Sequence, residues 1–165
     1  MTPLVVLVGP PGAGKTTVGE LLADRRKVSF RDTDRDVEAA TGRSVMDIFV
    51  DQGEPEFRRL ESAAVETALR DHSGVLALGG GAVLDATTRS RLSKHHVVFL
   101  DVGLTDAAAR IGLNRDRPLL MANPRSQLKR MLDERRPVYA EVASATVVTD
   151  GLTPDAVADA VASLL

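Results

Sequence analysis

The stretch "GPPGAGKTT", residues 9–17, directly follows the apolar run of residues 4–8. Its first eight residues match the pattern G-x-x-x-x-G-K-[ST], which binds phosphates when it lies between a strand and a helix. Glycine lets backbone N–H groups turn inward around phosphate oxygens, and the N-terminus of the following helix adds a partial positive charge. The apolar run predicts the strand, and residues 15–26 predict the helix. The stretch therefore indicates an α/β protein that binds a nucleoside triphosphate.

The side chains of this loop have separate expected roles. We expect the Lys15 ammonium to reach the β- and γ-phosphates of ATP and the Thr16 hydroxyl to hold Mg²⁺. The alternative is a glycine-rich turn that arose by chance, and the predicted strand and helix on either side argue against it. The loop residues predicted to bind ATP are Gly12, Ala13, Gly14, Lys15, Thr16 and Thr17.

The composition is typical of one soluble globular domain. The chain has 165 residues, 44% of them apolar and 27% charged, and a net charge of 21 − 23 = −2. This charge gives no general attraction to nucleic acids or membranes, and one Tyr, four Phe and no Trp offer few rings for base stacking. The absence of Cys excludes disulfides and Cys-based zinc sites. Without a signal peptide or an apolar run of about 18 residues, we predict a cytoplasmic protein.

Short apolar runs alternate with helical patterns along the chain. Continuously apolar strands between helices indicate a parallel sheet covered on both faces, so we predict one α/β domain. The predicted strands are residues 4–8, 28–30, 75–78, 97–101 and 146–149. The predicted helices are residues 15–26, 35–41, 45–49, 55–70, 86–93, 105–113 (capped by Thr105), 126–135 and 154–165. Residues 114–124, "NRDRPLLMANP", break the pattern and are predicted to form a loop.

The class of P-loop protein can be narrowed. A GTPase needs an Asn-Lys-x-Asp sequence after a strand, and "NRDR" at residues 114–117 instead follows a predicted helix. A motor or transporter ATPase would be longer and would carry coupling elements. A small kinase remains, and such an enzyme needs a site for the phosphate acceptor.

The sequence "DTD", residues 32–34, is one candidate for that site, because it follows the second predicted strand and the carboxyl ends of parallel strands face the ligand crevice. Residues two apart in an extended segment point the same way. Asp32 could then reach Mg²⁺ through water, and Asp34 could accept a hydrogen bond or a proton from an acceptor hydroxyl. The alternative is that an aspartate here only caps the next helix.

Two further segments have residues suited to binding an anion. "EFRRLE", residues 56–61, places Arg58 and Arg59 in a predicted helix, and arginine binds carboxylates through two parallel hydrogen bonds. The alternative is a solvated helix face on which Glu54 and Glu61 are the partners. "GGGAV", residues 79–83, ends a strand with three glycines, which permit close approach of a ligand to the backbone.

Taken together, these motifs resemble the shikimate kinase family, and its actinobacterial members most. The resemblance covers nearly the whole chain in order and rests on residues 9–17, "DTD" at 32–34, "EFRRLE" at 56–61, "LGGGAV" at 78–83, "RPLL" at 117–120 and "RRPVYAEVA" at 135–143. It implies one domain over residues 1–165, a small P-loop kinase of the nucleoside-monophosphate-kinase type with a five-stranded parallel sheet. It also implies transfer of the γ-phosphoryl group of ATP to the 3-hydroxyl of shikimate, in the pathway to chorismate and the aromatic amino acids.

The resemblance also implies roles for particular residues. Asp34 matches the residue that contacts the substrate hydroxyls, in a substrate-binding region of about residues 32–61. A lid of about residues 114–124 contains an arginine that reaches the transferred phosphate, so Lys15, Asp34 and Arg117 are the expected catalytic residues. Arg58 and Arg135 match residues that bind the substrate carboxylate, and Gly80 and Gly81 match residues that contact the substrate through their backbone. Thr16 and Asp32 match the metal-binding residues, and Arg110 and Pro154 match residues that flank the adenine.

Two assignments are ambiguous in the sequence. Arg135 and Arg136 are adjacent, and the spacing to Pro137 and Tyr139 selects Arg135 as the substrate ligand. "VVFLD", residues 97–101, resembles a Walker B strand, but the family places its metal carboxylate in "DTD", so we interpret Asp101 as a strand-end residue.

Two other functions fit the P-loop. One is another small-molecule kinase, for gluconate or a nucleoside monophosphate, and the paired arginines and three glycines favour a carboxylate-bearing acceptor instead. The other is a non-catalytic nucleotide sensor, which would have no use for an acceptor site. We therefore expect ATP and shikimate as the ligands, and a monomer.

Overall fold

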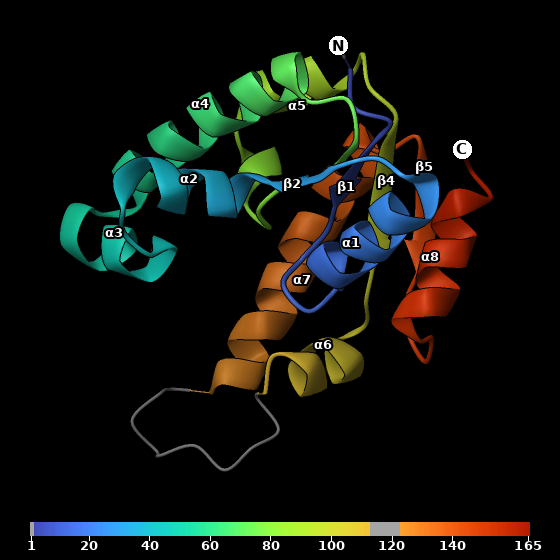
Figure 1. Ribbon diagram of the computed structural model, residues 1–165. Helices are drawn as coiled ribbons and strands as arrows, with labels where there is room; N and C mark the ends of the chain where they lie inside the picture. The colour runs from blue at the N-terminus through green and yellow to red at the C-terminus, as the bar shows by residue number, and fades with distance from the viewer. Residues whose placement is uncertain (1, 113–122) are drawn as a thin grey trace.

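The computed structural model describes residues 2–112 and 123–165. Its strands form one five-stranded sheet in the order β2-β3-β1-β4-β5, and every neighbouring pair is parallel. This confirms the predicted parallel sheet flanked by helices (Figure 1). The strands are β1 (Val5–Val8), β2 (Phe30–Asp32), β3 (Val75–Ala77), β4 (Val97–Asp101) and β5 (Ala145–Val148). The helices are α1 (Lys15–Arg26), α2 (Thr33–Thr41), α3 (Val45–Gln52), α4 (Glu54–Asp71), η1 (Ala82–Leu84), α5 (Ala86–Leu92), α6 (Leu104–Arg110), α7 (Pro124–Val142) and α8 (Pro154–Ala162).

The central strand β1 separates two apolar cores. Alternate residues of a strand point to opposite faces of the sheet. Val5 and Leu7 therefore pack with α1 and α8 on one face, whereas Val6 and Val8 pack with α4, α5 and the end of α7 on the other. Because both faces are covered, all four residues are buried, which explains why the strand reads as an unbroken apolar run.

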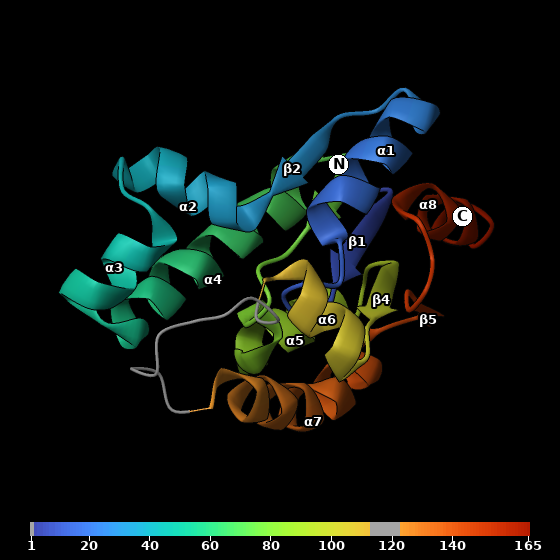
Figure 2. The same ribbon diagram turned by 90° about the horizontal axis from the view of Figure 1, so that it is seen from below.

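A third, smaller core lies beyond the β2 edge of the sheet. Val37, Ile48 and Phe57 form it where α2 and α3 pack against α4. Figures 1 and 2 show these helices as a unit beside the sheet, at the edge where β2 ends. Among residues 2–112 and 123–165, no helix is long and apolar enough to cross a membrane.

Several predicted boundaries were wrong. β2 begins at Phe30 rather than residue 28, and α2 begins at Thr33, so "DTD" is the junction of a strand and a helix and not one extended segment. α6 begins at Leu104 with Gly103 at its N-cap, so Thr105 does not cap it. α8 ends at Ala162 rather than at residue 165.

The largest boundary error concerns α7. The prediction ended it at residue 135, before a proline, but it runs from Pro124 to Val142 with Pro137 inside. Proline in a helix removes one N–H donor and is unfavourable there. Burial of Tyr139 beyond the proline, where it packs on Phe99 of β4, favours continuation of the helix.

Gly74, in the turn that leads into β3, packs closely against the segment before β2. A Cβ on Gly74 would collide with the backbone of Ser29, whose carbonyl accepts a 2.9 Å hydrogen bond from Val75 N. Gly74→Ala should therefore lower the free energy of unfolding by about 1–3 kcal/mol, measured by urea denaturation. Ser73→Ala, at the exposed neighbouring residue, is the control and should change it by less than about 0.5 kcal/mol. Equal stabilities for the two variants would contradict the close approach.

Candidate active site

The phosphate loop lies between β1 and α1, where the sequence predicted it. Gly12 and Gly14 have φ angles of 84° and 89°, a left-handed conformation that favours glycine, and Gly14 is the N-cap of α1. No side chain caps α1, so the backbone N–H groups of its first turn remain available to an anion.

Lys15 places a positive charge inside this loop. Its Nζ donates to the carbonyl oxygens of Gly9, at 2.6 Å, and Pro10, at 3.1 Å. Burial lowers the pKa of Lys15 to about 8, although the nearby charges of Asp34 and Asp32 act to raise it. The ammonium is therefore charged at neutral pH but poorly solvated, which favours its interaction with phosphate oxygens.

Thr16 and Asp32 form a pair of oxygen ligands beside the loop. The Thr16 hydroxyl donates to Asp32 Oδ2 at 3.0 Å, and Asp32 Oδ1 accepts from Asp34 N at 2.9 Å as the N-cap of α2. Asp32 therefore caps α2, as the structural alternative predicted, and its other carboxylate oxygen faces Thr16. A hydroxyl and one carboxylate fit Mg²⁺, which proteins commonly hold through one or two side chains plus water and phosphate.

Asp34 lies in the first turn of α2. It faces the same cavity as Asp32, although the extended geometry that predicted this was wrong. Burial raises the pKa of Asp34, and the Asp32 carboxylate raises it further, while Lys15 acts in the opposite direction. A carboxylate with a raised pKa is a better proton acceptor than an ordinary aspartate.

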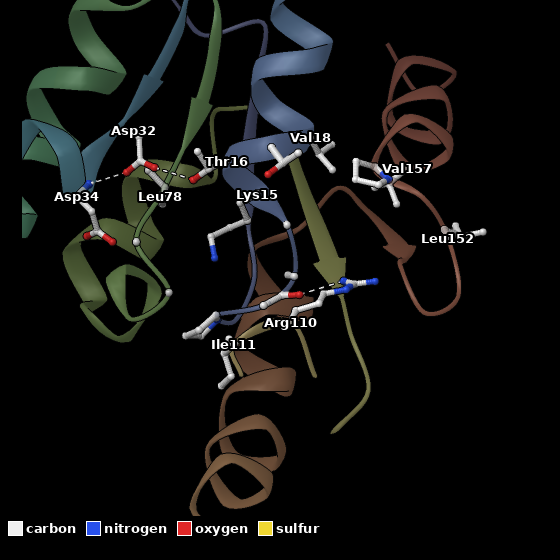
Figure 3. A pocket seen from close by; sticks show the side chains of 18 residues that line it. Lys15, Thr16, Val18, Asp32, Asp34, Leu78, Arg110, Ile111, Leu152 and Val157 are labelled. Atoms are coloured by element: carbon white, nitrogen blue, oxygen red, sulfur yellow. Dashed lines mark hydrogen bonds between the residues drawn. The ribbon is translucent and has the colours of Figure 1, made fainter. Parts of the chain in front are cut away.

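These groups line one cavity of about 560 Å³ at the carboxyl ends of β1, β2 and β3. Figure 3 shows Asp32 and Asp34 on one side of Lys15 and Arg110 on the other, with Leu152 and Val157 farther along. Arg110 donates to the Gly12 carbonyl at 3.0 Å, so it is fastened to the phosphate loop. The residues that line the cavity away from the carboxylates are Arg110, Ile111, Leu152, Pro154 and Val157.

Seven lining residues are not among the predicted site residues. Four of them, Pro11, Val18, Leu78 and Gly79, lie in or next to the quoted motifs, and the other three are Ile111, Leu152 and Val157. These three come from the end of α6 and from the β5–α8 region, which the sequence order does not place beside the phosphate loop. Only their apolar character is visible in the sequence, and it does not distinguish them from core residues.

Arg58 and Gly81 do not line this cavity but lie beside it and touch one another. A Cβ on Gly81 would collide with the Arg58 guanidinium, which donates to Glu61 Oε1 at 2.8 Å. Glu54 also accepts from Arg58, as the solvated-face alternative expected, but Glu61 is only 3% exposed. The alternative was right that Glu61 is a partner of Arg58 but wrong that it lies on a solvated face. Burial raises the pKa of Glu61 even beside Arg58.

The adjacent arginines of α7 point to different partners. Arg136 donates from Nε to Asp101 Oδ1 at 3.1 Å, at the end of β4. The charge of Arg135 instead acts on Lys15, Glu61 and Tyr139. Tyr139 donates its hydroxyl to the Gly80 carbonyl at 2.5 Å, which joins α7 to the glycine segment after β3.

Arg117 and all of the predicted lid at residues 114–124 except Asn123 and Pro124 lie outside the described residues. Asn123 and Pro124 form the N-cap and first residue of α7. In the described part of the chain, no group of three or more His, Asp or Glu residues is placed to hold a metal.

Comparison with known proteins identifies the family. The family model for shikimate kinase matches residues 11–165. The chain belongs to the shikimate kinase family. It is 59% identical to shikimate kinase of Salinispora arenicola over 165 residues, which cover 100% of this chain and 99% of that protein. It is 55% identical to shikimate kinase of Streptomyces avermitilis over 163 residues, covering 99% and 95%.

A solved family member has the same fold. Shikimate kinase from Acinetobacter baumannii in complex with shikimate superposes with a TM-score of 0.90 at 36% identity, covering 99% of this chain and 92% of that one. The actinobacterial relatives and this match confirm the resemblance found in the sequence motifs.

The lowered pKa of Lys15 predicts pH-dependent nucleotide binding. Only the ammonium form attracts phosphates, and the lysine loses its proton as the pH rises through about 8. The dissociation constant of a non-hydrolysable ATP analogue should therefore rise about tenfold between pH 7 and pH 9, measured by calorimetry. Lys15→Arg keeps its charge in this range and should show a flat profile. A flat profile in the unchanged protein would contradict the assignment.

The contact of Gly81 with Arg58 predicts a selective effect on the acceptor. In Gly81→Ala the new methyl group displaces the flexible Arg58 guanidinium, so the KM for shikimate should rise about tenfold or more. The affinity for the ATP analogue and the melting temperature should stay close to those of the unchanged protein. A parallel loss of nucleotide affinity would show that the substitution disturbs the whole site.

Proposed function

We propose that the cavity of Lys15, Thr16, Asp32 and Asp34, with Arg58 and Arg135 beside it, is where this chain phosphorylates shikimate. The chain is an enzyme of the shikimate kinase family, which transfers the γ-phosphoryl group of ATP to the 3-hydroxyl of shikimate on the route to the aromatic amino acids. One observation supports the residue assignment most strongly. The phosphate loop and Asp34 share a single cavity, and the guanidinium of Arg58 lies against the glycines beside it.

The acceptor end of the site suits a small carboxylate. Arg58 and Arg135 supply two guanidinium groups, and a guanidinium binds a carboxylate through two parallel charge-assisted hydrogen bonds. Asp34 and Arg58 lie against Gly79 and Gly81, because a side chain on Gly79 would collide with Asp34 and one on Gly81 with Arg58. The backbone of Gly80 and Gly81 is proposed to contact the acceptor beside these two side chains. The acceptor is then held by its carboxylate while one hydroxyl faces Asp34.

The nucleotide end supplies charge neutralisation. Phosphoryl transfer depends mainly on positioning and on stabilising charge on the phosphate oxygens. Lys15 and the N–H groups at the start of α1 neutralise the β- and γ-phosphates, and Arg117 acts on the transferred group. Thr16 and Asp32 would hold Mg²⁺, which would neutralise part of the charge on the phosphate oxygens. Arg110 and Pro154 flank the adenine.

Asp34 orients the acceptor hydroxyl and accepts its proton. The raised pKa of this carboxyl, caused by burial and by Asp32, makes it a stronger base than a solvated aspartate. Because its pKa is raised, the ionised form is lost at a higher pH than for an ordinary aspartate as the solution becomes acidic.

We further propose that residues 114–124 close over the bound substrates, which would protect ATP from water. We also propose that the enzyme acts as a monomer. The net charge of −2 favours small-molecule substrates over nucleic acids or membranes as partners, in the cytoplasm.

The test is ADP release with Mg²⁺ and ATP in the presence of shikimate, gluconate, AMP or CMP, with a reaction lacking acceptor as control. Release that depends on shikimate alone is expected. Release with another acceptor would refute the acceptor assignment, and ATP binding without any release would favour a nucleotide sensor.

Arg58→Ala tests the carboxylate site. Loss of one guanidinium should raise the KM for shikimate about tenfold or more, with little change in the affinity for the ATP analogue. Arg59→Ala is the matched control, because Arg59 is the next residue of α4 and pairs with Glu56 on the exposed surface. Arg58 is misassigned if the two variants have the same KM.

A further inference from the structure

Asp101 ends β4 in a sequence that resembles a Walker B strand, and the mechanism above gives it no role. Its carboxylate does not face Thr16 or Asp32 but accepts from Arg136 Nε at 3.1 Å. Arg136 also donates from Nη2 to the Val102 carbonyl at 3.3 Å. One arginine of α7 is thus held at two adjacent points by the end of β4.

The Asp101 end of this contact is rigid. Its backbone carbonyl accepts from Thr149 N at 2.8 Å and from the Thr149 hydroxyl at 3.1 Å, so the residue that follows β5 holds it. Thr149 in turn accepts from Arg110, which is bound to the phosphate loop. The end of β4, which bears this carboxylate, is therefore connected through Thr149 and Arg110 to the phosphate loop.

Arg136 lies in the turn of α7 that contains Pro137. Pro137 has no N–H, so the hydrogen bond that would join it to the Asp133 carbonyl is missing, and the helix is easier to bend at this turn. On the N-terminal side of Pro137, Leu128 and Leu132 are packed in the core with Val102. Arg136 is one turn beyond Leu132 on the same face of α7, so it extends the contact of this face with the end of β4.

The rotation of α7 at this turn decides where Arg135 points. Consecutive helix residues are about 100° apart around the axis, so a helix that holds Arg136 against β4 turns Arg135 toward a different neighbour. The charge of Arg135 acts on Glu61 and Tyr139. Tyr139 is four residues beyond Arg135 and so lies on the same face of α7.

We propose that Asp101 and Arg136 are a positioning pair, which holds the proline-weakened turn of α7 against β4 and so directs Arg135 to the carboxylate of the acceptor. The pair acts through Arg135 and does not touch the reacting atoms. The proposal rests on the proposed function of Arg135. Asp101, although it ends a Walker B-like strand, would thus contribute to acceptor binding rather than to metal binding.

The variants Asp101→Asn, Arg136→Gln and their combination test the pair. Each single variant should raise the KM for shikimate about five- to twentyfold with kcat changed less than about twofold, and the double variant should be no worse than the poorer single one. The ATP analogue should bind with unchanged affinity. Arg136→Lys keeps the cation and should lie between the unchanged protein and Arg136→Gln. Arg70→Gln, which removes an exposed ion pair of α4 with Asp71, is the matched control and should leave every value unchanged.

Three results would overturn the proposal. A higher Mg²⁺ requirement in Asp101→Asn but not in Arg136→Gln would make Asp101 a metal residue. Equal losses of shikimate and nucleotide affinity with a lower melting temperature would make the pair merely structural. Additive effects in the double variant would show that the two residues act separately.

Amide hydrogen exchange separates this proposal from the proposed function. Exchange over residues 134–142 should be faster in Asp101→Asn than in the unchanged protein, while residues 124–132 should be unaffected. This result supports the pair even if shikimate proves not to be the acceptor, in which case only the proposed function fails. Unchanged exchange over residues 134–142 refutes the pair.

Discussion

The ammonium of Lys15, half-buried between the phosphate loop and two carboxylates, is the charge around which the site is arranged. A lysine in this position is poorly solvated, and its charge is maintained by the carbonyls of Gly9 and Pro10 and by Asp32 and Asp34. These groups can meet only because β1, β2 and β3 are parallel and end at the same edge of the sheet. The parallel sheet thus brings a cation from one loop and carboxylates from another into one cavity.

Two other arginines near the site, Arg58 and Arg136, also have carboxylate partners. Arg58 is paired with the buried Glu61, and Arg136 with Asp101. Such pairs offset the cost of holding a cation out of water and fix its direction. A site that must bind two anions, ATP and a carboxylate-bearing acceptor, can therefore hold several positive groups close together.

The sequence predicted much of this because the P-loop is a local structure. Its strand, loop and helix are consecutive, so the place of the loop between β1 and α1 follows from spacing alone, and α1 has the predicted bounds. The boundaries that were wrong depend on partners distant in the chain. α7 passes through Pro137 because Tyr139 packs on Phe99 of β4 and hydrogen-bonds Gly80.

The sequence by itself determined the phosphate loop, the alternation of strands and helices that makes the sheet parallel, and the family. Each of these is encoded in short spacings or in motifs read in order. Only the tertiary structure decided that Glu61 is buried and that Ile111, Leu152 and Val157 line the cavity. It also decided that Arg136 pairs with Asp101, whereas the charge of Arg135 acts on Glu61 and Tyr139. The reason is that burial and charge pairing depend on which segments the sheet brings together. Two adjacent arginines are the same in sequence and differ only in what each face of the helix meets.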